Sequence, residues 1–284
     1  MIAIITDSTC DIPEGLIQEY QIIVVPHIII WGEEEFRDRV DLSPQAFYQR
    51  LAVDPQRPTT SQAGVVDFLN TIMSVQANGA TEAVILTVSS AMSGAFQMAC
   101  RAAEKVDIPV SVIDSKGPTM SQGWQVLAAA HAHDESANRV AIVEKVAEVR
   151  SRLVQIVAME NRDYLQTGGR IGDAAKWVGT MLNLKPVVSI NHETGKMEPV
   201  GLARSHKGMV QMLYSKYFKE VNYGKGLYIA VLHGNALEEV KKLTKGIVEE
   251  FSPVVMIVNV TGPVLGINTG PGALALCGYF EVQE

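Results

Sequence analysis

The chain has 284 residues, of which 47% are hydrophobic and 19% charged, and its formal net charge is −7 with an isoelectric point near 5.5. This length allows two domains, and an acidic chain without a Lys/Arg block argues against a nucleic-acid partner. The start lacks the basic region of a signal peptide and no apolar run reaches the ~18 residues of a membrane span, so we expect a cytoplasmic protein without a transmembrane segment.

In the first half of the chain, a short apolar strand leads into a polar turn and then a helix three times. The strands are predicted at residues 1–5, 83–86 and 110–113, and each is followed by Thr, Ser or Asp side chains. Parallel strands joined through helices bring such turns to one edge of a sheet. We therefore expect an α/β fold with a parallel N-terminal sheet and a binding site at its carboxyl edge.

A hydroxyl-rich segment lies between the first two of these strands. The pair Ser43-Pro44 starts a helix by the rule that a cap precedes proline, and a rigid connector then leads to Thr59–Gln62. We predict that this segment begins the next helix. Its Thr60 and Ser61 would add two neutral donors to the site.

The turn at Ser93-Gly94 carries the strongest functional signal, because an apolar strand ends there and a helix begins at Ala95. The first backbone N–H groups of a helix have no partner within it, so an anion fits this place. Ser93 can also simply cap the helix, and the two interpretations are compatible. A nucleophilic elbow would need glycine where Ala91 and Ala95 stand, which disfavours a hydrolase.

The second half predicts a mixed α/β domain. A helix over residues 140–153 is followed by a strand at 154–158, a hairpin, a helix and then a strand–helix–strand unit. We place the boundary so that residues 1–152 form an N-terminal α/β domain with the anion-binding turns and residues 153–284 form the second domain. Near the end, residues 262–272 hold four glycines and two prolines, which indicates close approach of the backbone to another part of the molecule.

Several kinds of chemistry have no signal in the sequence. The spacings of a dinucleotide fingerprint, a Walker loop, a zinc-protease helix and an EF-hand are missing, and the histidines do not cluster, so we expect no metal and no cofactor. Asp7 follows the first strand, where Asp more often fixes a turn than acts as a base. Cys10, Cys100 and Cys277 are widely spaced and are expected to be reduced thiols.

Short motifs also follow one another in a specific order along the whole chain. They are Thr6–Thr9, Thr60–Gln62, Ser89–Gly94, Asp114-Ser115, Tyr164-Leu165, Gly168–Ile171, Lys185-Pro186, Arg204 and Gly270–Gly272. In this order they resemble the DegV family, to which the FakB fatty-acid-binding proteins belong. The resemblance implies a two-domain protein that is not an enzyme and holds one long-chain fatty acid in a tunnel between its domains.

The resemblance also implies roles for particular residues. The positions matching Thr60 and Ser93 hydrogen-bond the carboxylate, with Ser61 and the Gly94 N–H nearby. A separate fatty acid kinase phosphorylates the bound acid, which would link the protein to phospholipid metabolism. Arg170 and Arg204 match arginines that face that kinase. We expect the free protein to be a monomer.

One position departs from the family pattern. Where the family usually has a His before Gly-Pro-Gly, this chain has Asn268. In family members that His helps to hold the carboxylate, whereas Asn can donate a hydrogen bond but cannot become charged. Asn268 is therefore either a ligand residue or only a turn residue before Gly270, where Asn is favoured.

Two other classes of function stay open. The first is an enzyme, a phosphotransferase or hydrolase that acts on a small anionic substrate at the Ser93 turn with Asp7 or Asp114 as base. The second is a regulatory protein that senses lipid without a kinase. Bound long-chain acid would separate lipid binding from the enzyme, and dependence on a kinase would separate the two lipid-binding classes.

Overall fold

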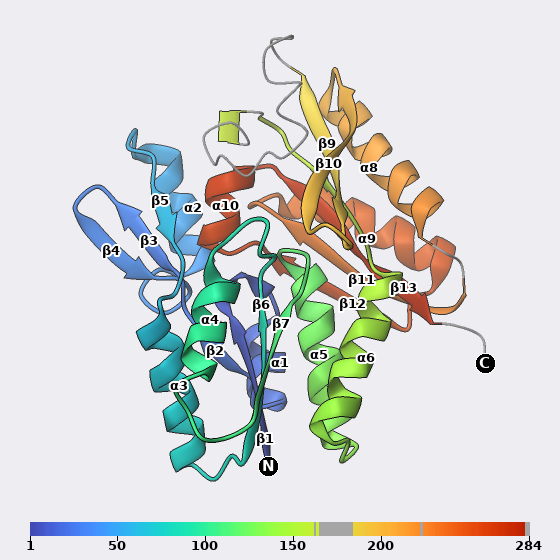
Figure 1. Cartoon of the computed structure of the whole chain (residues 1–284). Helices are drawn as coiled ribbons and strands as arrows, with labels where there is room; N and C mark the ends of the chain where they lie inside the picture. The colour runs from blue at the N-terminus through green and yellow to red at the C-terminus, as the bar shows by residue number, and fades with distance from the viewer. Residues whose placement is uncertain (162, 165–183, 222–223, 282–284) are drawn as a thin grey trace.

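Two β-sheets form the frame of the molecule, one parallel and one mixed (Figure 1). The computed structural model describes residues 1–161, 163–164, 184–221 and 224–281. In this part of the chain the order of the elements agrees with the predicted alternation of strands and helices. The predicted α/β class is therefore confirmed.

The parallel sheet has four strands in the order β2-β1-β6-β7, and every neighbouring pair is parallel. Its strands are β1 (Ile2–Asp7), β2 (Ile23–Val25), β6 (Glu82–Thr87) and β7 (Val110–Asp114). Helices cover both faces of this sheet (Figure 1). Helices α3 (Val65–Ala77) and α4 (Ala95–Ala103) lie on one face, and helices α5 (Met120–Asp134) and α6 (Arg139–Arg152) lie on the other. Because successive side chains of a strand point to opposite faces, Ile5 packs toward α3 and α4 while Ile4 packs toward α5 and α6.

The mixed sheet has six strands in the order β10-β9-β8-β13-β11-β12, of which only β11 and β12 are parallel neighbours. Its strands are β8 (Val154–Ala158), β9 (Lys185–Asn191), β10 (Lys196–Ala203), β11 (Lys225–His233), β12 (Val255–Val260) and β13 (Leu274–Glu281). Helices α8 (His206–Glu220) and α9 (Leu237–Phe251) pack on one face. On the other face, Leu232 and Cys277 share a core with Met120 and Trp124 of α5. The two sheets are thus joined by one hydrophobic core.

A small antiparallel sheet in the order β4-β3-β5 closes one side of the molecule. The elements of this region are the 3-10 turn η1 (Ser8–Cys10), α1 (Glu14–Glu19), β3 (Ile28–Trp31), β4 (Glu34–Arg37), α2 (Pro44–Val53), β5 (Thr59–Ser61) and α10 (Pro263–Thr269). Val264 of α10 packs with Phe47 and Tyr48 of α2. A segment near the end of the chain is therefore held against the N-terminal part.

One local prediction was wrong, and one helix was not predicted. Residues 59–62 do not begin a helix, because β5 pairs with β3 through Thr60 and Ile29 and the next helix starts only at Val65. The glycine-rich segment holds a helix, α10, in which Pro263 takes the first turn and Asp11 Oδ1 accepts a hydrogen bond from Gly262 N at 2.9 Å. The edge of β3 and the carboxylate of Asp11 contact these two segments but lie far from them in the sequence, so local sequence patterns could not reveal either contact.

The predicted domain boundary lies at a short connection between the sheets. Helix α6 ends at Arg152 and β8 begins at Val154, so residues 1–152 include the parallel sheet and residues 153–284 the mixed one. The division into two domains at this residue stays a prediction. Among the helices of the described residues, none combines the length and the apolar character needed to span a membrane.

Candidate ligand-binding site

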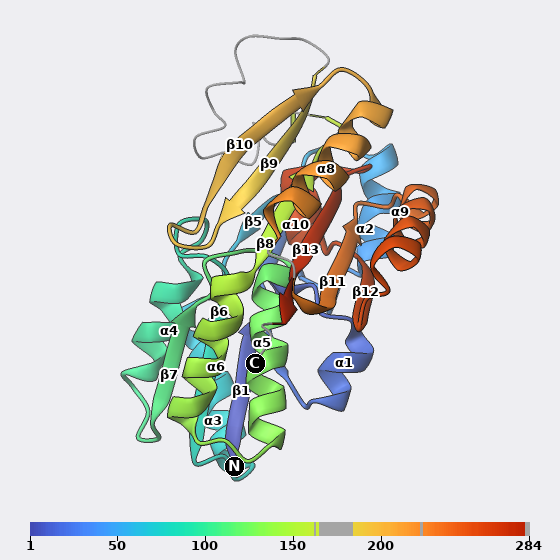
Figure 2. The same cartoon turned by 90° about the vertical axis from the view of Figure 1, so that its right-hand side faces the viewer.

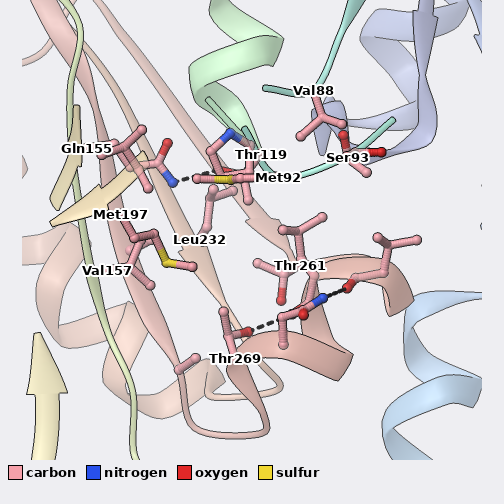
Figure 3. Close-up of a pocket in the computed structure, with 18 of the residues that line it drawn as sticks. Val88, Met92, Ser93, Thr119, Gln155, Val157, Met197, Leu232, Thr261 and Thr269 are labelled. Atoms are coloured by element: carbon pink, nitrogen blue, oxygen red, sulfur yellow. Dashed lines mark hydrogen bonds between the residues drawn. The ribbon is translucent and has the colours of Figure 1, made fainter. Parts of the chain in front are cut away.

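A cavity lies between the carboxyl edge of the parallel sheet and the inner face of the mixed sheet (Figure 3). It encloses about 950 Å³ of space between atoms, its open mouth included. Its apolar lining consists of Val88, Met92, Pro118, Val157, Met159, Ile190, Met197, Leu232, Val264, Leu265, Ala273, Leu274 and Ala275. Its polar lining consists of Thr9, His27, Thr60, Gln62, Ser93, Thr119, Gln155, Thr261, Asn268 and Thr269. The wall that it presents to a ligand is mostly apolar.

The strands of the mixed sheet supply most of the apolar wall. In β8 and the residue that follows it, Gln155, Val157 and Met159 line the cavity, whereas Ile156 and Ala158 belong to the core under α8. This alternation is the two-residue period of a strand. Figure 3 shows Val157 and Met197 on the side of the cavity opposite Ser93.

Ser93 stands where the sequence placed it, in the turn between β6 and α4. Its Oγ accepts a hydrogen bond from Ala95 N at 3.2 Å, so it caps the start of the helix. A hydroxyl has one proton to donate as well as lone pairs to accept, and the cap uses only a lone pair. Ser93 can therefore cap its helix and still donate into the cavity that it lines. Gly94 is the N-cap residue of α4 and lies against the side-chain amide of Gln62.

Thr60 and Ser61 lie on opposite faces of β5. Thr60 is half-buried and lines the cavity, while Ser61 is exposed and is not among the lining residues. Their separation follows from strand geometry, in which neighbouring side chains point apart. The structure thus brings Thr60 and Ser93 to one cavity, and it directs Ser61 to the surface beside it.

Asp7 is completely buried and ties two turns together. Its Oδ1 accepts from Thr9 N at 3.0 Å, and its Oδ2 accepts from Val88 N at 2.8 Å. Burial by itself would raise the pKa of Asp7, but the neighbouring His27 and these hydrogen bonds hold it below its usual value. The interpretation of Asp7 as a residue that fixes turn geometry is confirmed.

Asp114, the other candidate base, has a similar role in the next turn. Its Oδ1 accepts from Ser90 N at 3.1 Å and from Lys116 N at 3.0 Å, and its Oδ2 forms an ion pair with Lys116 Nζ at 2.9 Å. Burial by itself would raise the pKa of Asp114, but the hydrogen bonds from Ser90 and Lys116 hold it below its usual value. Both candidate bases are therefore held by the turns that they organise.

Several predicted donors point away from the cavity. Ser89 Oγ donates to Gly195 O at 2.7 Å and Ser115 Oγ donates to Gly117 O at 2.8 Å. Figure 2 shows how the β9–β10 hairpin, whose turn contains Gly195, extends down toward the turn after β6. The Ser89 hydroxyl links the turn after β6 to the hairpin of the mixed sheet, whereas the Ser115 hydroxyl closes its own turn. Of the hydroxyl residues in the predicted turns, Thr9, Thr60 and Ser93 line the cavity.

Asn268 lies in α10 rather than in a turn and lines the cavity, and its role as a ligand residue stays a prediction. Its Nδ2 donates to Val264 O at 2.7 Å, one turn back in the helix. A side-chain amide has two protons, and the second can still be donated. The close backbone approach predicted for this segment is confirmed at Gly270, which has φ +76° and packs against the ring of Tyr164.

Sequence reasoning missed several polar residues of the cavity, including His27, Gln62 and Gln155. Gln155 Nε2 donates to Thr119 Oγ1 at 2.9 Å, so this pair forms a polar spot across from Ser93 (Figure 3). One signal was present, because His27 and Gln155 interrupt otherwise apolar strand sequences. Such an interruption indicates a polar cavity only when the neighbouring strands are known.

The remaining predicted residues lie away from the cavity or outside the described part. Arg204 is exposed between β10 and α8, and Arg170 lies outside the described residues. Within the ranges that the structure places, no three His, Cys, Asp or Glu side chains gather as a metal site requires. The three cysteines are free thiols, as expected, and burial raises the pKa of Cys10 and of Cys277 to about 12.

Comparisons with known proteins agree with this architecture. A family model described as "Uncharacterised protein, DegV family" matches residues 1–281. A DegV domain-containing protein of Halalkalibacterium halodurans is 31% identical over 281 residues, which is 99% of each chain, and protein DegV of Bacillus subtilis is 28% identical over 283 residues, also 99% of each.

Solved structures lead to the same family. A DegV family protein of Thermus thermophilus, described by its fatty acid binding, superposes with a TM-score of 0.91 at 27% identity over 99% of both chains. DegV of Bacillus subtilis, described as a fatty acid binding protein, superposes with a TM-score of 0.89 at 26% identity, again over 99% of both chains. Since one family model spans nearly the whole chain and the fold agrees from end to end, this protein belongs to the DegV family.

Proposed function

We propose that the protein binds one long-chain fatty acid in the cavity between its two sheets. The acyl chain would lie along the apolar wall of the mixed sheet, and Thr60 and Ser93 would hydrogen-bond the carboxylate, with Asn268 as a further donor and Ser61 and Gly94 nearby. The observation that carries the proposal is a mostly apolar cavity whose lining includes the hydroxyl groups of Thr60 and Ser93. The two related structures described as fatty acid binding support it.

Neutral donors suffice for such a ligand because the tail supplies most of the binding free energy. Burial of about 14 methylenes contributes roughly 11 kcal/mol at about 0.8 kcal/mol each, before the loss of translational and rotational freedom is counted. A neutral hydrogen bond adds about 1 kcal/mol. The tail therefore determines affinity, and the hydroxyl groups determine which end of the ligand is held at the turns.

The second part of the proposal is that the protein presents the carboxylate to a separate fatty acid kinase and does not itself catalyse a reaction. Thr60 and Ser93 are half-buried and Ser61 beside them is exposed, so a bound head group would lie near the surface. Asp7 and Asp114 hold turns, which supports binding over general-base chemistry. In this proposal Arg204, together with Arg170, forms part of the surface that faces the kinase.

The first test identifies the ligand that copurifies with the protein. We expect denaturing extraction of protein purified from a cell host, followed by lipid mass spectrometry, to recover about one fatty acid per chain. Protein that is delipidated and then incubated with palmitate should regain one equivalent. A nucleotide or phosphosugar in place of lipid would contradict the proposal and favour an enzyme that acts on a small anionic substrate.

The second test concerns the partner. Charge reversal in Arg204→Glu should leave palmitate affinity unchanged and slow phosphorylation of the bound acid by a fatty acid kinase. Lys145→Glu, an equal charge change at an exposed residue of α6, is the matched control and should leave both unchanged. Equal phosphorylation rates in Arg204→Glu and wild type would remove Arg204 from the partner surface.

A further inference from the structure

His27 is a buried residue whose ring lines the cavity. It connects β2 to β3 and is 3% exposed. Its backbone is fixed on both sides, since His27 N donates to Ser8 Oγ at 3.1 Å and His27 O accepts from Asp38 N at 2.8 Å. The imidazole is thus held in place at the same cavity as Thr9 and Thr60.

One nitrogen of this ring faces a carboxylate. His27 Nε2 lies 3.7 Å from Asp7 Oδ1, and within the described residues it has no hydrogen-bond partner. Asp7 is itself immobilised by Thr9 and Val88, as described above. A carboxylate fixed on one side of an imidazole orients the ring and stabilises its protonated form. The other nitrogen, Nδ1, is then the one available to a ligand.

The charges around His27 also favour a cation at this position. Asp7, Asp11 and Asp38 are all buried, and Arg39 forms an ion pair with Asp11 while it also faces Asp38. Among the described side chains, the one ion pair of Asp7 is with His27. Burial raises the pKa of Asp11 and of Asp38, whereas the pKa of Asp7 stays below its usual value despite burial. Asp7 is therefore the buried carboxylate whose negative charge an imidazolium at His27 would compensate.

We infer that His27 is a head-group ligand of the cavity, and that it selects free fatty acids over uncharged lipids with the same chain. This inference rests on the proposed function. The imidazolium, held by Asp7, donates a hydrogen bond from Nδ1 to one oxygen of the carboxylate, while Thr60 donates to the head group from β5 and Ser93 from the turn before α4.

The selectivity follows from the difference between a charged and an uncharged head group. A carboxylate gains a charge-assisted hydrogen bond from the imidazolium, which is about twice as strong as a neutral one. A methyl ester of the same chain length fills the same apolar wall but has no charge for His27 to stabilise. Comparison of the two ligands therefore separates contact with the head group from packing along the chain.

The experiment uses delipidated full-length protein and titrates palmitate and methyl palmitate into wild type, His27→Leu and His27→Asn. His27→Leu should weaken palmitate binding roughly 10- to 100-fold and change methyl palmitate binding less than about threefold. His27→Asn keeps a donor near the position of Nδ1 without the charge, and it should lose roughly three- to tenfold for palmitate. His131→Leu, at an exposed histidine of α5, is the matched control and should bind like wild type.

Two outcomes would overturn the role of His27 while lipid binding by wild type stood. One is an equal loss of affinity for palmitate and methyl palmitate in His27→Leu, and the other is an unchanged palmitate affinity in that variant. Wild type that binds neither ligand would instead refute the proposed function itself.

Discussion

The two walls of the cavity are built in different ways. The head-group wall, formed by Thr9, His27, Thr60 and Ser93, comes from turns and from the short strand β5. The acyl wall, formed by Val157, Met159, Met197 and Leu232, comes from the regular mixed sheet. Polar atoms of the first wall are positioned by individual hydrogen bonds, whereas apolar side chains of the second need only fill space.

Because of this difference, the acyl wall mainly determines the affinity for a ligand, and the head-group wall mainly determines the selectivity among ligands. Interactions of the acyl wall depend on buried area, are not directional and add up along the chain. Interactions of the head-group wall depend on the position of single atoms, so one misplaced donor removes its whole contribution. Changes to the ligand tail should therefore have larger effects than changes to single head-group residues.

The largest expected effect concerns the acyl wall and needs no substitution. Shortening the ligand from palmitate to laurate removes four methylenes, which should weaken binding by about 3 kcal/mol, or roughly 200-fold. Titration of delipidated protein with saturated acids of increasing length measures this. Equal affinities across the series would place the tail outside the cavity.

The next prediction concerns the free energy of unfolding and the buried carboxyl of Asp38, whose backbone N–H donates to His27 O behind the head-group wall. Burial raises the pKa of Asp38 to about 6 from 3.8, although Arg39 opposes the shift. An acid with a raised pKa in the folded state stabilises that state below the unfolded pKa, and this contribution is lost as pH rises through the folded pKa. Asp38→Asn should therefore increase the free energy of unfolding at pH 7 by up to about 3 kcal/mol and have little effect near pH 4.

Urea denaturation of wild type and Asp38→Asn at both pH values measures the difference. Asp107→Asn, at an exposed acid in the connection between α4 and β7, is the matched control and should change neither value. A less stable Asp38→Asn at pH 7 would mean that the neighbours of Asp38 fully compensate the cost of burying its charge.

A smaller effect is expected from the neutral donors. Thr60→Ala combined with Ser93→Ala should reduce palmitate affinity by about 2 kcal/mol, or roughly 30-fold, because two neutral hydrogen bonds contribute about 1 kcal/mol each. Ser61→Ala, at the exposed neighbour of Thr60, is the control and should change palmitate affinity little. An unchanged affinity in the double variant would place the carboxylate elsewhere in the cavity.

The same contrast between the walls explains what the sequence could predict. The strand at residues 83–86 and the helix that begins at Ala95 are recognisable because period, capping and chain composition are local. Ser93 could be chosen as a candidate ligand-binding residue from the same local features. Parallel strands then place several such turns at one edge, which is why a binding site at that edge was a sound prediction.

The rest of the site depends on contacts between distant residues. Thr60 lies in a strand because β3 offers it an edge 31 positions earlier, through Ile29. His27 follows proline in an apolar run and resembles core sequence until Asp7 is seen beside its ring. Pro263 after Gly262 was a readable helix start, but the density of glycines obscured it.

The smallest effect is expected at Asn268, which lines the cavity from α10. Asn268→His would place a second imidazole at the cavity, but the present amide already donates to Val264 O and His27 already supplies an imidazole. Histidine gains charge as pH falls between about 8 and 5, so the variant should bind palmitate up to a few-fold more tightly near pH 6 and about equally at pH 8. The gain should grow in a His27→Leu background, because the added imidazole would then be the one cation able to face the carboxylate. Affinities of the single and double variants at the two pH values measure both effects. Identical pH profiles for wild type and Asn268→His would remove Asn268 from the carboxylate site and leave it as a helical residue that only lines the tail.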